Sequence, residues 1–216
     1  MQAQPPKGGD SPRPPQENLP IPAQNERDLS PAAEKRRGRG SFAARRVALV
    51  AVCAALIEAG KLALSFLPNV EVVTLLCALF GYVFGGYGIL SAAVFVCIEP
   101  LIYGFNTWVI SYFLYWPFVS AVFFLLRRAA IRNRWVLTAA AVLLTVWFGV
   151  LTSLVDVGLF TGFYERFFYR FGIYYMRGIW FYVVQILCNL FLFPTLFLFL
   201  EKKIRAFRRR FLPDGR

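Results

Sequence analysis

The chain is dominated by long apolar segments that follow one another from about residue 43 to residue 200. A membrane-spanning helix needs about 20 predominantly apolar residues, so a series of such runs is typical of an integral membrane protein. The segments cover about residues 43–66, 70–84, 87–103, 107–126, 135–158 and 177–200. We therefore expect an all-α integral membrane fold, a bundle of six transmembrane helices.

The second and third segments are short for a span. They meet at a glycine-rich turn, Gly85-Gly86-Tyr87-Gly88, so they are either tilted hairpin helices or a re-entrant pair. Both options return the chain to the same side of the membrane.

Composition supports the membrane class, since 58% of the residues are hydrophobic and only 17% are charged, whereas soluble domains carry about 25% charged residues.

The formal net charge of +12 reflects basic residues that flank the apolar segments, which is a topology signal rather than a sign of nucleic-acid binding. The opposite end of the bundle has only Arg166, Arg170 and Arg177. Because Lys and Arg accumulate on the cytoplasmic side, both termini are expected there. The basic residues at that end are Lys35, Arg36, Arg37, Arg39, Arg45, Arg46, Arg127, Arg128, Arg132, Arg134, Lys202, Lys203, Arg205, Arg208, Arg209 and Arg210.

Composition also divides the chain. Residues 1–40 hold most of the prolines and almost no aromatic or β-branched residues, so they are expected to form a disordered cytoplasmic tail. Residues 41–203 form the expected six-helix membrane domain, and residues 204–216 a basic cytoplasmic tail.

The chain contains no histidine, and its four cysteines are isolated in apolar segments without C-x-x-C spacing. Histidine bases, His-ligated metals and thiolate metal sites are therefore not expected. Phosphate loops and other catalytic motifs are missing as well. No cofactor, metal or enzymatic activity is predicted, and a transport process would need a separate energy source.

Polar and aromatic side chains recur at helical spacing in four of the segments. Such stripes either form hydrogen bonds between helices or line a ligand pocket, and tyrosines near a membrane interface are often anchors. Because all four stripes lie near the outer level, we expect an outward-facing pocket with aromatic walls. The stripes are Glu99 and Tyr103; Trp108, Tyr112 and Tyr115; Thr145, Gly149, Thr152 and Asp156; and Tyr182, Gln185 and Asn189.

Two further patterns have alternative interpretations. Glu58 and Lys61 lie one turn apart in the first helix, where a self-neutralising pair is the simpler interpretation and a ligand-facing charge the other. The aromatic loop at 160–175 is either an amphipathic segment on the membrane surface or a lid over the pocket.

Small residues recur every four positions in the first helix, at Ala51, Ala55, Ala59 and Ala63. Such a stripe permits close approach of another helix. It serves either internal packing or contact with a partner protein.

Three stretches carry a family resemblance. FLPNVEVVTLLCALFGYVFGGYG (66–88) resembles the first external loop and second helix of substrate-binding S components of energy-coupling factor (ECF) transporters. EPLIYGFNTWVISYFLYWP (99–117) resembles that family's E-x-x-x-Y-G-F-G-x-W stretch, with Asn106 in place of its last glycine. RGIWFYVVQILCNL (177–190) is similar to the sixth helix, where Tyr182 and Gln185 replace a polar residue and a histidine and Asn189 is retained.

The resemblance implies six helices in the plasma membrane and a vitamin-like ligand bound from the extracellular side. It also implies partners: a transmembrane coupling subunit and two ATP-binding subunits, with Ala51 and Ala55 at the docking contact. The residues expected to face the ligand are Glu99, Tyr103, Asn106, Trp108, Tyr112, Asp156, Gln185 and Asn189. The alternative is a non-transporting assembly or scaffold partner on a similar bundle, and a membrane-embedded enzyme using Asp156 or Glu99 is a third.

The link between the first two segments contains Pro68, Asn69 and Glu71. Pro68 is expected to end the first helix and Asn69 to cap the second. Glu71 suits the positive N-terminus of that helix, and its alternative place is at the rim of the pocket.

Overall fold

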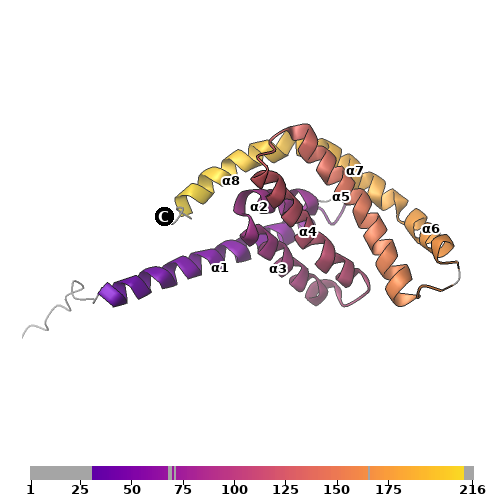
Figure 1. Ribbon diagram of the computed structural model, residues 1–216, viewed down its shortest axis with the longest axis horizontal. Coiled ribbons are helices and arrows are strands. Elements are labelled where there is room, and N and C mark those ends of the chain that lie inside the picture. The colour runs from indigo at the N-terminus through magenta and orange to yellow at the C-terminus, as the bar shows by residue number, and fades with distance from the viewer. Residues whose placement is uncertain (1–30, 68–69, 71, 165, 212–216) are drawn as a thin grey trace, which may run out of the picture. The chain divides into compact units, whose positions relative to one another are not determined.

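The computed structural model describes residues 31–67, 70, 72–164 and 166–211. Contacts divide the chain into Met1–Arg39 and Gly40–Arg216, and the packing described below lies within the second unit. The regular structure of the described residues is helical throughout (Figure 1). Its elements are α1 (Pro31–Ala63), α2 (Val73–Phe84), α3 (Gly86–Tyr103), α4 (Trp108–Arg128), α5 (Arg134–Leu154), η1 (Val155–Phe160), α6 (Phe167–Arg177), α7 (Ile179–Leu192), η2 (Phe193–Phe197) and α8 (Leu198–Phe211).

Four helical stretches of the described residues are long and apolar enough to cross a membrane. The all-helical class is thereby confirmed, and the four stretches indicate a membrane protein. The shorter α2 is also apolar but has only 12 residues. The four stretches are Gly86–Tyr103, Trp108–Arg128, Arg134–Phe160 and Ile179–Arg209.

Each apolar segment of the sequence corresponds to a helix, with differences at the ends. The tail predicted for 1–40 falls mostly outside the described residues, but α1 already begins at Pro31. Pro68, Asn69 and Glu71, for which roles at the end of α1 and the start of α2 were predicted, also lie outside the described residues. At the other end, α8 continues to Phe211, past the predicted boundary at 203.

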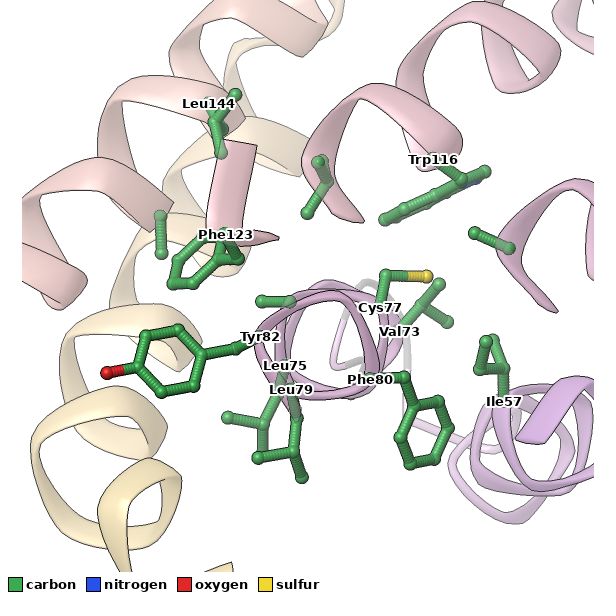
Figure 2. Close-up of a cluster of buried hydrophobic side chains, with 14 of the residues drawn as sticks. Ile57, Val73, Leu75, Cys77, Leu79, Phe80, Tyr82, Trp116, Phe123 and Leu144 are labelled. Atoms are coloured by element: carbon green, nitrogen blue, oxygen red, sulfur yellow. The ribbon is translucent and has the colours of Figure 1, made fainter. Parts of the chain in front are cut away.

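The second helix is the centre of the packing. Every residue of α2 except Leu76 is buried, and its side chains leave the helix in all directions (Figure 2). Tyr82 points toward the C-terminal helices, whereas Phe80 lies on the side of Ile57 in α1. A helix that is apolar all round belongs in a protein interior. At about 1.5 Å rise per residue, α2 spans only about 18 Å, less than the roughly 30 Å of a hydrocarbon core.

Polar contacts fix the carbonyl groups of α2 to its neighbours. The Ser120 hydroxyl of α4 donates a hydrogen bond of 2.9 Å to the Cys77 carbonyl. The Arg208 guanidinium of α8 donates one of 2.8 Å to the carbonyl of Val83, in the last turn. Carbonyls in the last turn of a helix have no intrahelical partner, and a cation there is favoured by the helix dipole. The basic end of α8 is therefore part of the packed structure.

Glycines permit the tight packing of α2, α3 and α4. A Cβ atom on Gly81 would lie 2.1 Å from the Ser120 carbonyl oxygen, and one on Gly88 would lie 2.2 Å from that of Phe80. The turn between α2 and α3 is made by Gly85, whose φ of 62° is in the left-handed region. The predicted glycine-rich turn is thus confirmed.

The C-terminal helix changes direction between α7 and α8 (Figure 1). The π-helical turn η2 contains Pro194, which has no backbone N–H to continue the α-helical hydrogen bonds. Phe193 and Phe197 of this turn are buried, and their rings lie 5.5 Å from that of Phe123 in α4. The bend therefore brings the C-terminal part of the chain back onto the core.

The aromatic segment predicted at 160–175 contains a short helix, α6, none of whose residues is buried. Arg170 closes the preceding loop by donating hydrogen bonds to the carbonyls of Thr161 and Gly162, at 3.1 and 2.7 Å. The rings of Phe168 and Tyr169 are exposed. An exposed amphipathic helix of this kind suits the membrane surface.

Replacing Gly81 by alanine tests the close approach of α2 and α4. The added Cβ would meet the backbone of Ser120, which cannot move as a side chain can, so we expect the free energy of unfolding to fall by about 1–3 kcal/mol. Gly86→Ala is the matched control, because nothing lies within 4 Å of its Cβ position. Thermal unfolding of both variants in detergent measures the difference, and equal midpoints would contradict the packing described here.

Candidate functional site

A charged cluster joins α1 and α3 at one end of the bundle. Lys61 of α1 forms an ion pair with Glu99 Oε2 of α3. The Lys61 Nζ atom also lies 4.2 Å from the ring centroid of Tyr103 and 5.7 Å from that of Tyr112. An ammonium group within about 6 Å of an aromatic ring face is attracted by it. The ammonium group therefore sits among one carboxylate and two rings.

The predicted pair of Glu58 with Lys61 is wrong. Lys61 reaches across to Glu99, and no hydrogen bond is made to either oxygen of Glu58. The carboxyl group of Glu58 instead lies against that of Glu99. Two ionised carboxylates can only accept hydrogen bonds, whereas a protonated carboxyl group can donate one to its neighbour. The register between α1 and α3 explains the exchange of partners, because it brings Glu99 within reach of the long lysine side chain.

Both carboxyl groups are buried. Glu58 is 8% exposed and Glu99 is 0% exposed. Three of their four oxygen atoms, both of Glu58 and Oε1 of Glu99, have no hydrogen-bond partner. A buried polar group without a partner costs about 1–3 kcal/mol, and more if it is charged. We define Glu58, Lys61 and Glu99 as the acidic cluster.

A continuous series of rings connects this cluster to α5 and α7. The rings of Trp108 and Tyr112 are 4.9 Å apart, and Tyr112 is 6.1 Å from Phe148 of α5. Phe148 is in turn 6.4 Å from Tyr182 of α7. Of the three aromatic residues predicted to line the pocket from α4, Trp108 and Tyr112 belong to this series of rings, whereas Tyr115 is buried in the core. Phe148 was missed, although it lies between Thr145 and Gly149 on the predicted stripe.

The polar stripes of α5 and α7 face each other. The Asn189 side-chain amide donates a hydrogen bond of 2.8 Å to Thr145 Oγ1, and the hydroxyls of Thr152 and Tyr182 lie 3.2 Å apart. Gln185 is buried on the same helix and also has a partner. Asn189 therefore makes a helix–helix contact, which is the alternative to a ligand contact.

Two predicted ligand residues, Asn106 and Asp156, belong to neither of these groups. Within the described part of the chain, no hydrogen bond or ion pair connects them to the acidic cluster or to the polar side chains that pair α5 with α7. Asn106 is exposed, and its side-chain oxygen accepts a bond of 2.6 Å from the backbone N–H of Thr107. Asp156 is half-buried in η1. The predicted site is thus divided into an acidic cluster with Tyr103, Tyr112 and Trp108, and a polar layer between α5 and α7.

The predicted docking residues Ala51 and Ala55 are both exposed on α1. Ala51 lies in an open apolar groove of about 300 Å³ between α1 and α3. Leu90 and Val94 of α3 form part of its opposite wall. The groove is lined mostly by larger apolar side chains, and the small exposed residues Ala51 and Ala55 of α1 would permit close approach of another helix.

Metal-binding chemistry has no candidate among the described residues, which contain no group of three or more histidine, cysteine or acidic side chains close together. The cysteines in this part of the chain are free thiols, and Cys53 and Cys77 are buried.

No family model matches the chain, and no curated protein or solved structure gives a match.

A double-mutant cycle tests the contact between α5 and α7. We expect Asn189→Leu and Thr145→Val to show a coupling free energy of about 0.6 kcal/mol, up to about 1.7, as measured for hydrogen bonds between transmembrane helices. Thr195→Val replaces Thr145→Val in the control cycle, because the Thr195 hydroxyl is exposed and bonds to its own helix. Equal coupling in both cycles would mean that Asn189 does not hold α5 and α7 together.

Proposed function

We propose that the chain is a membrane-embedded substrate-capture subunit of an ECF-type importer. It would bind a vitamin or related small molecule from the extracellular side and deliver it inward with a separate coupling subunit and two ATP-binding subunits. The observation that carries this proposal is the acidic cluster, because ionisable side chains buried within a membrane bundle are energetically costly and typically mark a functional site.

The surroundings of the acidic cluster suit a small-molecule site. Tyr103 is 48% exposed, and it is followed by the exposed residues Gly104, Phe105 and Asn106. Trp108 and Tyr112 supply aromatic surface beside the cluster. Apolar walls with a few converging polar groups are the usual composition of such sites.

The charge distribution supports the proposed orientation. Arg205 lies within electrostatic range of Arg127, Arg132 and Arg209, so the basic residues of α4, α8 and the loop after α4 gather at one end. The acidic cluster lies near the C-terminal ends of α1 and α3, at the end of the bundle opposite to these basic residues. In a six-span arrangement with both termini in the cytoplasm, this cluster faces outward. In that arrangement, α1 from about residue 43 and the buried α2 would join the four long apolar stretches to make six helices. The protein would lie in the plasma membrane.

Ligand capture is tested by mass spectrometry of the purified full chain after equilibration with a mixture of water-soluble vitamins. We expect one compound to be retained, and Glu99→Gln to lower its retention at least about tenfold because a buried charge pair is broken. Glu201→Gln is the matched control, since Glu201 is also buried and ion-paired, to Arg205, at the other end of the bundle. Retention of no compound by the wild-type chain would favour the non-transporting scaffold.

Docking is tested by Ala51→Leu together with Ala55→Leu. The larger side chains would fill the small-residue face of α1, so uptake of the retained compound by cells should be lost while its binding to the purified protein is unchanged. Ala139→Leu, on the exposed side of α5, is the control and should leave uptake intact. Undiminished uptake in the α1 variant would remove this face from the docking contact.

A further inference from the structure

The environment of the Lys61 ammonium group is that of a cation-binding site. Its Nζ atom pairs with Glu99 Oε2 and lies over the ring of Tyr103, with the ring of Tyr112 at 5.7 Å. Carboxylates and aromatic faces are the groups by which proteins recognise ammonium ligands. Here this cage is filled by a side chain of the protein itself.

The single ammonium group of Lys61 is too few for the carboxyl groups around it. The cluster has two carboxyl groups, and three of their four oxygens have no hydrogen-bond partner. When both carboxyl groups are ionised, the cluster carries one negative charge more than Lys61 neutralises. The surplus negative charge therefore attracts a further cation to the cluster, where it competes with Lys61 for Glu99 and the two tyrosine rings.

Lys61 is able to leave that place. Its side chain is 22% exposed, whereas the carboxyl groups beneath it are buried. Lysine has a flexible stem of four carbons and readily extends its ammonium group toward water near a membrane surface. Its departure would leave Glu99 Oε2 and the faces of the Tyr103 and Tyr112 rings free to contact a ligand.

We propose that the acidic cluster binds a small organic cation with an ammonium group, and that Lys61 is a tethered occupant which this ligand displaces. The inference rests on the proposed capture function and names the chemical class of its ligand. The exchange keeps Glu99 paired in both states, so the buried carboxylate is never left without a counter-charge. The ring of Tyr103 is half-exposed and provides the side from which the ligand enters.

The displacement is tested on the full chain in detergent with choline as the probe and 3,3-dimethylbutan-1-ol, its neutral carbon analogue, as the control compound. Lys61 is acetylated with an amine-selective reagent, and the modification is quantified by mass spectrometry. We expect millimolar choline to raise the acetylation rate of Lys61 severalfold and the neutral analogue to leave it unchanged. Lys202 and Lys203 are exposed and serve as internal references whose rates stay constant.

A second, independent test measures thermal unfolding of a variant that lacks the Lys61 ammonium group. Lys61→Met removes the tethered cation and leaves two buried carboxyl groups without it, so we expect a lower unfolding midpoint than in the wild type. Choline should then raise the midpoint of Lys61→Met more than that of the wild type, because it replaces the missing ammonium group. Adding Glu99→Gln to Lys61→Met should abolish this rescue, whereas adding Glu201→Gln should not.

Equal effects of choline and its neutral analogue in both measurements would overturn the cation site. That result differs from failure of the proposed function. A chain that retains a neutral or anionic vitamin in the experiment above remains a capture subunit without an ammonium site. If the chain retains no compound and does not respond to choline, both the capture function and the ammonium site are contradicted.

Discussion

The burial of α2 on all sides is the constraint on which the rest of the structure depends. This helix is too short to cross a hydrocarbon core by itself, and it never needs to face lipid because α1, α3, α4 and the C-terminal helices surround it. Glycine contacts at Gly81 and Gly88 set how closely its neighbours approach. The hydrogen bonds from Ser120 and Arg208 then fix its position along their axes.

Packing around α2 also determines where the polar groups meet. Ile57 of α1 is fully buried in the core, and Glu58 and Lys61 follow within one turn. Phe95 of α3 is fully buried too, and Glu99 follows four residues later on the same face. Anchoring these two apolar residues in the core therefore brings the charged residues beyond them together. The acidic cluster is a consequence of the helix register that the core imposes.

This dependence explains what the sequence could and could not predict. Apolar run length located the helices, and helical spacing correctly grouped Thr145 with Thr152 and Tyr182 with Asn189. The partner of Lys61 was not predictable, since Glu99 lies 38 residues away on another helix and spacing describes only one helix at a time. The bend at η2 had a local signal in Pro194, but its direction depends on the fit of Phe193 and Phe197 against α4.

The two polar regions of the bundle differ in a way that separates structural from binding roles. Between α5 and α7, Asn189 and Tyr182 already have partners, so a ligand there would have to break contacts that hold the helices together. In the acidic cluster, a ligand that displaces Lys61 breaks one ion pair but replaces it with its own, and three further carboxyl oxygens without a hydrogen-bond partner remain available to it. Favourable binding free energy is therefore available where the fold leaves acceptors unsatisfied. The rings of Tyr112 and Phe148 join the two regions, so the satisfied layer supports the wall of the unsatisfied one.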